Sequence, residues 1–449
     1  MVKITVKNLI PFLALVFIAV CSLFIPSSGV FVDTLHQYNG ADITWIIIAS
    51  ALVFLMTPGL AFFYGGMVHR KNVLSTMMKS VVAAGIVSVI WVFVGYSLCF
   101  GKSIGGFIGN PFTHLFFKDV ISGAPWSLAP TIPLGLFALF QLMFAIITPG
   151  LVVGAVAERI KFSAYTLFIL LFSLLVYAPI AHWTWHPEGF LFKMGILDFA
   201  GGTVVHISAG CAALAGAIVL KQRKVHIEQK EIPPANIPYV LIGTGLLWFG
   251  WFGFNAGSAL GANALAVSAF ATTNTAAASA GLSWMFFDVL RGKKPSVLGF
   301  CIGAVVGLVA ITPSAGFVAI PQSIFIGVTA AIISNVAVYY KQKSTLDDTL
   351  DVFPCHGIGG IVGMILSGIF ATKSMNPLGN DGLFYGNLSF FLVQLKGLFI
   401  VVAYSFIMSF AIFKFINYVL PLRVSSADEE IGLDASQHNE KYMHVSPQH

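Results

Sequence analysis

Apolar runs of membrane-spanning length recur along almost the whole of this 449-residue chain. A helix needs about 20 mostly apolar residues to cross the hydrocarbon core of a bilayer. Because 57% of the residues are hydrophobic and only 9% are charged, a soluble domain of this size is excluded. The sequence predicts an all-α polytopic membrane protein with eleven transmembrane helices, near residues 43–64, 77–100, 133–157, 162–181, 199–220, 238–258, 268–287, 297–311, 321–340, 356–371 and 388–418.

A further apolar run, from Leu9 to Ile25, precedes these eleven. Lys3 and Lys7 stand before its centre, and Pro26-Ser-Ser-Gly29 follows it. A basic segment, an apolar core and then small residues are typical of a signal peptide. We therefore predict a signal peptide over residues 1–29, a transmembrane domain over 30–421 and a polar tail over 422–449. An uncleaved twelfth span is the alternative for the first segment, because no small-x-small cleavage site is visible.

Lysine and arginine residues orient the predicted helices, because cytoplasmic loops carry an excess of them. If the first of the eleven helices enters from outside, seventeen basic residues fall on the cytoplasmic side. Only five fall outside, apart from two in the signal segment. We therefore predict a multi-pass protein of the cytoplasmic membrane, with its N-terminus outside and its C-terminus inside. This bias explains the net charge of +6 without nucleic acid, since no basic stripe with interleaved aromatics occurs.

Five is an odd number, so a second set of five helices is inserted upside down relative to the first. The predicted architecture is a 5+5 inverted repeat, a common transporter plan with sites at the repeat interface near the membrane midplane. The eleventh helix falls outside the repeat, and its length indicates that it leans across the others.

Two histidines occupy matching places in this repeat. His206 lies in the fifth predicted helix and His356 in the tenth, and each follows an aspartate, Asp198 or Asp351, at the mouth of its helix. Ionisable groups at membrane depth are costly and usually functional. A packing role, with the ring bonded to a carbonyl, is the alternative for any single membrane histidine. The matched positions favour a shared functional role.

Other chemistries find little support in the sequence. The five cysteines lie in or beside apolar runs with no CxxC pair, so neither a metal site nor a disulfide framework is indicated. No glycine-rich loop is followed by Lys-Ser or Lys-Thr, which argues against ATP hydrolysis. We predict that the protein is not an enzyme and carries no cofactor. Haem with His206 and His356 as axial ligands is an alternative that needs a porphyrin-sized cavity.

Several segments, in order along the chain, resemble the ammonium transporter family, the Amt branch of the Amt/Mep/Rh superfamily. They are Pro58-Gly-Leu-Ala-Phe-Phe-Tyr-Gly-Gly66, Gly154-Ala-Val-Ala-Glu-Arg-Ile-Lys-Phe-Ser163, Asp198-Phe-Ala-Gly-Gly-Thr-Val-Val-His206, Gly250-Trp-Phe-Gly-Phe-Asn-Ala-Gly-Ser258, Asp351-Val-Phe with His356-Gly357, and Leu422-Arg-Val with Glu430-Ile-Gly-Leu-Asp434. The resemblance implies a homotrimer of eleven-helix subunits, each with its own narrow pore, that takes up ammonium and its analogue methylammonium.

The resemblance also implies roles for individual residues. It implies that His206 and His356 are the pore histidines and that Asp198 is a structural aspartate near the pore mouth. It also implies an external ammonium site of Phe144, Trp185 and Ser258, with a stacked gate of Phe140 and Phe254 beneath it. The chain departs from the family pattern in carrying bulky Leu142 and Met143, and in the turn His186-Pro-Glu188, where a glycine-rich turn is usual. The outer site is therefore where a difference in shape or affinity is expected.

The aromatic and serine residues have simpler alternative roles. Phe140 and Phe144 are four residues apart and share a helical face, which is typical of packing. Trp185 suits an interfacial aromatic belt. Ser258 suits a hydrogen bond back to its own helix.

The acidic residues near the histidines are expected to serve the helices. For Asp198 we favour capping of the following helix over direct contact with a cation. Asp351, with Asp347 and Asp348, is expected to form a solvated cap on the cytoplasmic side.

A histidine pair suits ammonium because this ion can lose a proton and an alkali metal ion cannot. Moving a bare ion of this size into a low-dielectric medium costs on the order of 20 kcal/mol in the idealised limit. A cation–π contact returns only about 2 kcal/mol. No Thr-Val-Gly-Tyr-Gly filter is present to replace the hydration shell. We therefore predict recruitment at an outer aromatic site, deprotonation, and passage of ammonia past imidazoles that can both donate and accept.

Two alternatives share this fold. One is an ammonium sensor, which would usually carry an added cytoplasmic domain. The other is an Rh-like conduit for neutral ammonia or gas, which the predicted aromatic recruitment residues argue against.

The tail from Ser425 to His449 is acidic and poor in apolar residues, a composition typical of disorder. The resemblance instead implies that the tail packs on the cytoplasmic face of the trimer and takes part in regulation. A soluble nitrogen-signalling protein of the PII type is the candidate partner that the resemblance suggests at that face.

Overall fold

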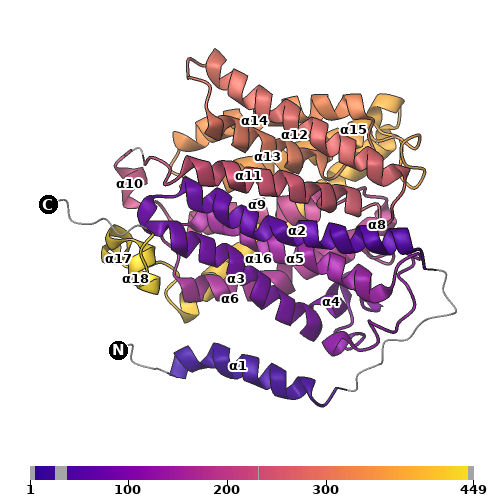
Figure 1. Ribbon diagram of the computed structural model, residues 1–449, viewed down its shortest axis with the longest axis horizontal. Coiled ribbons are helices and arrows are strands. Elements are labelled where there is room, and N and C mark those ends of the chain that lie inside the picture. The colour runs from indigo at the N-terminus through magenta and orange to yellow at the C-terminus, as the bar shows by residue number, and fades with distance from the viewer. Residues whose placement is uncertain (1–5, 26–37, 231, 443–449) are drawn as a thin grey trace.

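Long helices lie side by side in the computed structural model of this protein, which describes residues 6–25, 38–230 and 232–442 (Figure 1). Among these residues, nine helices are long and apolar enough to cross a membrane by length and composition. A single short hairpin, of β1 (Ser103–Ile104) and β2 (Ile108–Gly109), is the strand structure of the described chain. The prediction of an all-α polytopic membrane protein is therefore confirmed at this level.

Many membrane-spanning helices are continuous runs of several segments. We call these runs rods and number them in chain order from Gly40, so that Arg70–Phe100 is the second rod and Phe162–Met194 the fourth. In the first half, α-helical, π-helical and 3₁₀ segments follow one another within a rod. The segments are α1 (Val6–Ser22), α2 (Gly40–Met67), η1 (Arg70–Asn72), α3 (Val73–Ile90), η2 (Trp91–Gly95), α4 (Tyr96–Phe100), η3 (Leu115–Phe117), α5 (Leu134–Val156), α6 (Phe162–Phe172), η4 (Ser173–Tyr177), α7 (Ala178–Trp185), α8 (Phe190–Met194), η5 (Gly202–Ile207), α9 (Ser208–Leu220) and α10 (Lys224–Ile227).

The second half has longer uninterrupted helices. Its segments are α11 (Ile237–Trp251), η6 (Phe252–Ala256), α12 (Ala264–Leu290), α13 (Val297–Ile311), α14 (Ile320–Gln342), η7 (Phe353–Ile358), α15 (Gly359–Phe370), η8 (Leu383–Tyr385), α16 (Leu388–Val419), α17 (Ser426–Ile431) and α18 (Leu433–His438). In both halves η2, η4, η5, η6 and η7 are π-helical turns.

Two predicted spans fall short of the length or hydropathy of a typical crossing. α13 has 15 residues, fewer than the roughly 20 of a full span. α12 has 27 residues, but alanine, serine and threonine dilute its apolar character. The two helices pack on each other and on α14. α13 is mostly buried, whereas α12 has one buried face and one exposed face that includes Val267 and Phe286. The polar residues Thr272 and Thr273 of α12 lie on its buried face, where they contact protein rather than lipid.

Several helices begin or end beyond the predicted bounds. The second rod begins at Arg70 rather than residue 77, and the fourth continues through Trp185 rather than stopping at 181. The extra residues of the second rod include Asn72 and Thr76, which are buried against protein. Hydropathy alone marks such polar residues as the end of a helix.

Polar side chains at the helix starts fix where many of the rods begin. Asn39 accepts hydrogen bonds from the backbone of the first turn of α2, and Asn236, Asn263, Ser296 and Asn387 do the same for α11, α12, α13 and α16. Such caps satisfy backbone N–H groups that have no partner within the helix.

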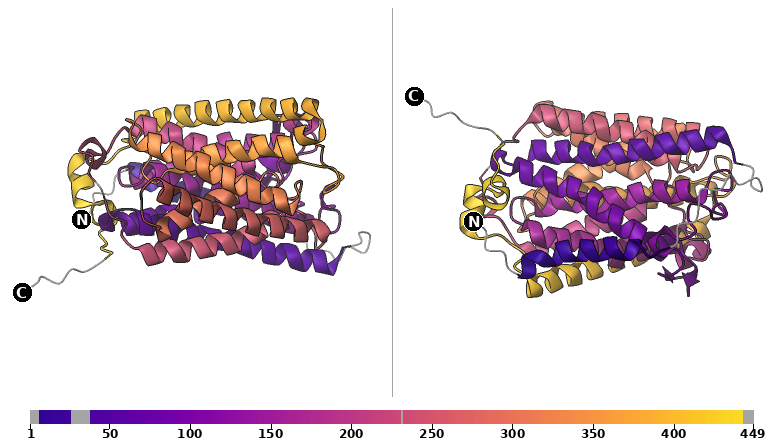
Figure 2. Two further views of the ribbon diagram at one scale, coloured as in Figure 1. Left: turned by 90° about the horizontal axis from the view of Figure 1, so that it is seen from above. Right: turned by 60° about the horizontal axis from the view of Figure 1, so that its bottom comes forward.

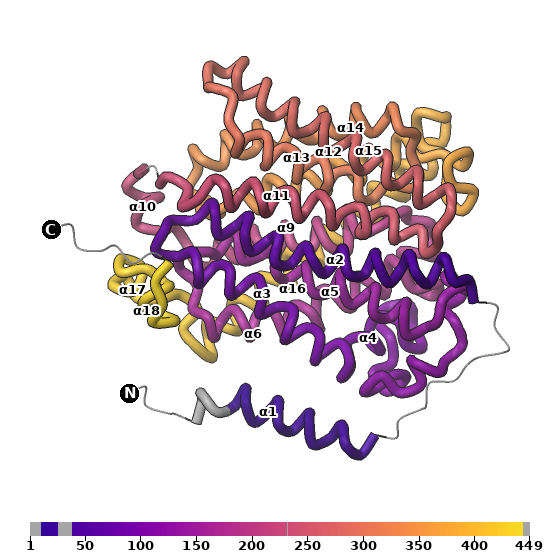
Figure 3. Tube along the Cα trace, in the orientation of Figure 1, coloured from indigo at the N-terminus to yellow at the C-terminus, as the bar shows by residue number. Residues whose placement is uncertain are grey.

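The predicted tail packs against one end of the bundle, which we call the tail end; the opposite end is the far end (Figure 3). The carboxylate of Asp434 accepts hydrogen bonds from the backbone of Leu74 (3.1 Å) and Ser75 (2.8 Å) and so caps α3. The backbone of Leu433, which is buried, donates to Asn72 Oδ1 at 2.8 Å. The described tail is therefore ordered, because polar caps and the buried side chain of Leu433 hold it against the bundle.

The last membrane helix, α16, has 32 residues. At 1.5 Å per residue it is about 48 Å long, against about 30 Å for the hydrocarbon core. Figure 2 shows it along one side of the bundle, where it packs on α9 and α15.

α1 lies beside the bundle rather than within it (Figure 1). From Ile10 onward most of its apolar side chains are exposed, including Phe12 and Phe17. The predicted cleavage region around Pro26 lies outside the described residues, so the signal peptide stays a prediction.

Candidate functional site

His206 and His356 lie against each other inside the bundle. Their Nδ1 atoms are 3.4 Å apart, and their ring centroids are 5.4 Å apart with 29° between the ring planes. In a hydrogen bond between them one Nδ1 donates and the other accepts. Both side chains are buried, and Nε2 of His206 has no hydrogen-bond partner among the described residues. That nitrogen is therefore free to bind a small polar molecule.

Close backbone contact brings the two histidines together. Gly210 lies one turn after His206, and a Cβ atom at Gly210 would collide with the backbone of Gly357, next to His356. Only glycine allows so close an approach. The sequence analysis did not single out this pair. A glycine beside each histidine, on two helices predicted to face each other, is the signal that would have identified it.

Asp198 caps the start of η5, the turn that carries His206. Its carboxylate accepts hydrogen bonds from the backbone of Gly201 (2.9 Å), Gly202 (2.6 Å) and Thr203 (2.7 Å), and from the Thr203 hydroxyl. Its carbonyl accepts a hydrogen bond from Trp185 Nε1 at 3.1 Å. A carboxylate in this position also complements the positive end of the helix dipole.

Asp348 caps the start of η7, the turn that carries His356. It accepts hydrogen bonds from the backbone of Val352 (3.0 Å) and Phe353 (2.7 Å). The sequence analysis matched Asp351 with Asp198 and expected a solvated cap, but Asp348 is fully buried. Burial raises the pKa of Asp348 to about 6. Asp351 instead forms an ion pair with Lys341 at 2.8 Å.

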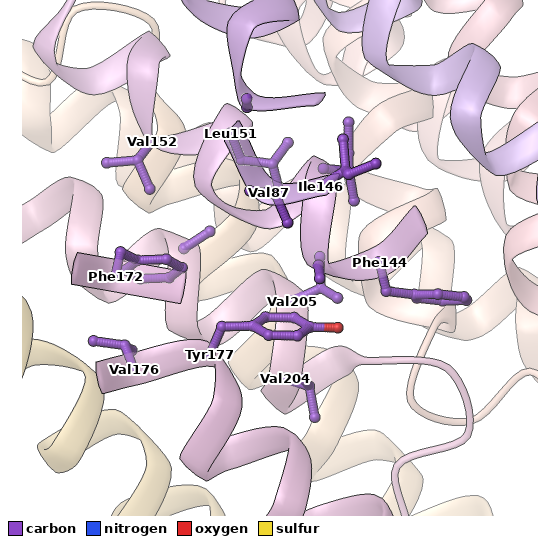
Figure 4. Packing of buried hydrophobic residues seen from close by; sticks show 14 of the residues in the cluster. Val87, Phe144, Ile146, Leu151, Val152, Phe172, Val176, Tyr177, Val204 and Val205 are labelled. Carbon is purple, nitrogen blue, oxygen red and sulfur yellow. The ribbon is translucent and has the colours of Figure 1, made fainter. Parts of the chain in front are cut away.

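Two small cavities lie along the histidine pair, each of about 10 Å³. This volume is about what a single water-sized molecule needs. One cavity is lined by both histidines and by apolar side chains that include Leu151 and Val205, which Figure 4 shows in the core. The other lies toward the tail end and is lined by Tyr64, Cys355 and His356, among others. The mostly apolar walls offer few ligands for a bare cation.

Aromatic rings continue from the histidines toward the far end. His206 stacks with Trp251 (5.3 Å) and Phe254 (5.8 Å). Phe144 packs on Phe254 at 4.4 Å, and Phe140 packs on Phe144 at 4.9 Å. The two residues of the predicted gate, Phe140 and Phe254, are thus connected through Phe144. Phe140 lies one turn farther from the histidines on α5, which leaves Phe144 level with η6.

Trp185 and Ser258 adjoin this aromatic group. The ring of Trp185 is 5.9 Å from Phe144 at 79°, an edge-to-face contact. The hydroxyl of Ser258 donates to the carbonyl of Phe254 at 2.8 Å, the helix back-bond expected as its simpler role. Since that hydrogen bond uses the hydroxyl proton, the oxygen lone pairs remain available as acceptors.

An ion-pair network lies buried at the tail end. Arg223 pairs with Asp347 at 2.7 Å and with Glu158 at 2.5 Å, and Arg159 donates to the Asp347 carbonyl at 2.5 Å. The prediction that Asp347 is solvated is therefore wrong, because it is only 1% exposed. Although burial acts to raise it, pairing with Arg223 holds the pKa of Asp347 well below its usual range.

A wider cavity of about 400 Å³ opens at the tail end. It shares Met67 and Leu350 with the small cavity at His356. Polar and charged side chains form most of its remaining wall, including His69, Arg223 and Lys341. The surroundings therefore change from apolar at the histidines to polar at the tail end.

The sequence pattern of the Ammonium Transporter Family matches residues 44–443. The chain belongs to the ammonium transporter family. The ammonium transporter of Aquifex aeolicus (strain VF5) is 47% identical over 407 residues, covering 90% of this chain and 94% of that protein. The ammonium transporter of Bacillus subtilis (strain 168) is 46% identical over 403 residues, covering 89% and 98%. Among solved structures, Saccharomyces cerevisiae Mep2 superposes with a TM-score of 0.85 at 36% identity, covering 93% of this chain and 94% of that one.

The protein is thus an ammonium transporter of the multi-pass membrane type and not an enzyme. The buried pair of His206 and His356 is consistent with a twin-histidine pore. The haem alternative does not fit, because a porphyrin ring has no room between imidazoles in direct contact. Within the described ranges, no group of three or more His, Cys, Asp or Glu side chains is placed to hold a metal ion.

The sequence analysis missed the role of Trp251 in this transporter. Its ring stacks on His206, and its Nε1 donates to Thr312 Oγ1 at 2.9 Å, which fixes the ring. Trp251 lies three residues before Phe254, a spacing that places both on one helical face. This spacing from Phe254, a residue of the predicted gate, is the sequence signal that would have indicated Trp251.

Proposed function

We propose that this transporter recruits ammonium from outside at its far end and passes it to the cytoplasm as ammonia along the histidine pair. The observation that carries the proposal is the buried contact between His206 and His356 beside cavities of about 10 Å³ with mostly apolar walls. These cavities suit a neutral molecule of ammonia's size and disfavour a bare cation.

The outer ammonium site in this proposal comprises Phe144, Trp185 and Ser258. The two rings offer their faces to a cation, and such contacts contribute about 0.5–2 kcal/mol each, depending on desolvation. The free lone pairs of Ser258 would accept an ammonium N–H. Potassium has no N–H to donate, so the serine would favour ammonium over an ion of similar size.

The gate in this proposal is the contact between Phe144 and Phe254, supported from behind by Phe140. The 4.4 Å separation of the first two rings supports this arrangement. A rotation of one ring would admit ammonia to the histidine cavity. Phe144 therefore serves both the outer site and the gate.

Proton transfer precedes entry into the apolar section: ammonium gives up one proton to a water molecule at the outer mouth and continues as ammonia. Asp198 already accepts hydrogen bonds from several backbone N–H groups, so we assign it structural support rather than the role of proton acceptor. The histidine pair then offers ammonia one acceptor and one donor at a time. Whether the proton follows decides whether transport carries charge.

The proposed topology has eleven transmembrane helices in a 5+5 inverted repeat, with the N-terminus outside and the C-terminus cytoplasmic. In its support, Leu220 at the end of α9 contacts Arg423 at the tail end, whereas Asp347, just before η7, lies at the same end. The two histidine-bearing rods therefore run in opposite directions. Residues 1–29 are proposed to be a signal peptide that is removed.

We propose two partnerships on the strength of the family resemblance. We propose a homotrimer, supported by exposed apolar side chains along several helices, for example Phe249 and Phe399. These faces suit either lipid or a neighbouring subunit. A PII-type protein is the proposed regulator, and the polar 400 Å³ cavity at the tail end offers it a recess. Crosslinking in native membranes, with and without the purified PII-type protein, tests both.

Transient current on a solid-supported membrane tests the transport mechanism. Purified protein in liposomes receives an ammonium jump and, as a control, a potassium jump. A current with ammonium alone means selective, charge-carrying transport. An internal pH rise without current means neutral conduction, the Rh-like behaviour. His206→Ala and His356→Ala are expected to abolish the response, and a response of wild-type size in both variants would refute the pore role of the pair.

A further inference from the structure

A third small cavity lies apart from the histidine pair, between the second and fourth rods. Its volume is about 10 Å³, and it shares no lining residue with the two cavities at the histidines. Trp91 and Cys99 line it from the second rod, Ser173 and Tyr177 from the fourth, and Ala145 from α5. Ala145 directly follows Phe144, so the cavity lies behind the helix that carries the proposed gate.

Two hydroxyl groups in this wall have no hydrogen-bond partner in the described part of the chain. They are Oγ of Ser173 and Oη of Tyr177, whose residues are 7% and 1% exposed. Figure 4 shows Tyr177 among buried apolar side chains that include Val87 and Phe144. A buried hydroxyl without a partner is costly, and at membrane depth bulk water cannot reach it. Both groups therefore require a partner that the neighbouring protein atoms do not supply.

Both rods form π-helical turns where they meet the cavity. Ser173 and Tyr177 are the first and last residues of η4, and Trp91 and Gly95 are the first and last residues of η2. A π-turn widens the helix and marks functional positions in many proteins. Here the two wide turns leave between them a space for one small molecule, with a hydroxyl at each end of η4.

We propose that this cavity binds a single water-sized molecule that hydrogen-bonds both Ser173 and Tyr177. Its volume is about the minimum that holds one water, and bound internal waters typically contact two to four polar groups. The two hydroxyls supply two such contacts, and the Cys99 thiol is a weak third. Water and ammonia share this chemistry, so the source is either solvent or the transported substrate. The bound molecule links the two ends of η4, and its weak third contact, Cys99, is in α4 of the second rod.

Direct observation comes from a high-resolution structure of the full-length protein. We expect a density peak within hydrogen-bond distance of both Ser173 Oγ and Tyr177 Oη. The same peak should be absent from the double variant Ser173→Ala/Tyr177→Phe. An empty cavity in the wild-type protein at a resolution that shows other internal waters would overturn the proposal.

Thermal unfolding gives an independent test, because the sign of the shift differs between a filled and a dry cavity. If the molecule is bound, Tyr177→Phe removes one of its partners and lowers the melting temperature. If the cavity is dry, the same substitution removes an unpaired hydroxyl and raises it. Tyr177→Phe keeps the ring, so this single variant tests the proposal even if the double variant fails to fold. A higher melting temperature for Tyr177→Phe would refute the proposal.

Ser405→Ala is the matched control. Ser405 is fully buried in α16, its hydroxyl also lacks a partner among the described residues, and it lines none of these three cavities. We expect this variant to melt at or above the wild-type temperature. A fall equal to that of Tyr177→Phe would mean that loss of any buried hydroxyl, rather than loss of a bound molecule, explains the result.

The same variants test whether Ser173 and Tyr177 share one bound molecule, and whether that molecule is water or ammonia. A shared ligand makes the effects of Ser173→Ala and Tyr177→Phe non-additive, whereas strictly additive shifts would contradict a shared ligand. Unfolding in ammonium-free buffer and with saturating ammonium separates the sources. A shift independent of ammonium identifies water, and one that appears only with ammonium identifies ammonia. The water site does not rest on the transport mechanism, so its failure would leave that mechanism unaffected.

Discussion

Asp198 and Asp348 stand in the same relation to the two histidines of the transporter. Each lies eight residues before its histidine, and each accepts hydrogen bonds from the first backbone N–H groups of the π-turn that carries it. The two rods run in opposite directions through the bundle. Two equivalent caps at opposite ends are what an inverted repeat requires, and this support for the repeat is independent of the charge bias.

Replacing Asp198 by alanine removes the cap of η5. Loss of an N-cap costs about 0.5–2 kcal/mol, and we expect the upper end because three backbone N–H groups lose their closest acceptor. The helix start would shift, and methylammonium uptake would fall with it. Uptake by proteoliposomes and thermal unfolding in detergent measure both effects. Asp198→Asn, which keeps an acceptor oxygen, should retain part of each, and an alanine variant as stable as wild type would contradict capping.

Asp348 should make stability depend on pH in the mildly acidic range. Its pKa is about 6 in the folded protein, against about 3.9 in an unfolded chain. A carboxyl whose pKa is raised by folding contributes stability at low pH, and that contribution is lost as pH rises through the folded value. Relative to Asp348→Asn, the wild-type free energy of unfolding should fall by up to roughly 3 kcal/mol between pH 4 and 6.

Unfolding of both proteins across pH 4–8 measures this difference, and subtracting the asparagine variant cancels the other titrating groups. Above about pH 7 the difference should be constant, since Asp348 is then fully ionised. A difference that grows with rising pH would show that the backbone hydrogen bonds outweigh burial.

Phe144 and Phe140 should differ in their effects on transport. Phe144→Ala removes the ring that contacts both Trp185 and Phe254, so the proposed outer site would lose a cation–π partner and the proposed gate one side. A loss of about 1–2 kcal/mol corresponds to a 5–30-fold weaker apparent affinity for ammonium. Phe140→Ala leaves the contact between Phe144 and Phe254 in place and should change affinity less.

The concentration dependence of the ammonium current measures both phenylalanine variants, with size-exclusion profiles to verify folding. A potassium current in Phe144→Ala alone would identify that ring as part of the barrier. A larger effect of Phe140→Ala on affinity would favour the original pairing of Phe140 with Phe254.

The ion-pair network at the tail end should matter more for stability than exposed pairs do. Arg223→Met leaves Asp347 and Glu158 buried without their shared cation, and breaking a buried pair in this way costs about 3–5 kcal/mol. Lys230→Met is the matched control, because Lys230 pairs with Glu228 in an exposed position, where solvent screening leaves such a pair little effect on stability. Equal melting temperatures for the two variants would contradict a structural role for the network.

Much of the fold could be read from hydropathy, because a span that faces lipid must be long and apolar. The predicted helix bounds were least accurate where a helix is surrounded by protein rather than by lipid. Asn72 and Thr76 extend the second rod because they are buried against protein, and α12 tolerates serine and threonine for the same reason. The described part of the tail, up to Tyr442, is ordered although the composition of the tail is typical of disorder, since Asp434 binds the start of α3.

By itself the sequence determined the class of protein, the family and the two histidines, because apolar length, quoted motifs and ionisable groups at membrane depth are properties of the chain alone. Only the tertiary structure decided which acid caps His356's helix, which ring lies on Phe254, and that Gly210 and Gly357 let the histidines meet. Those outcomes depend on how far one rod is shifted and rotated against the next. A shift of α5 by one helical turn would bring Phe140 instead of Phe144 against Phe254. No local pattern in the sequence indicates which of the two rings makes that contact.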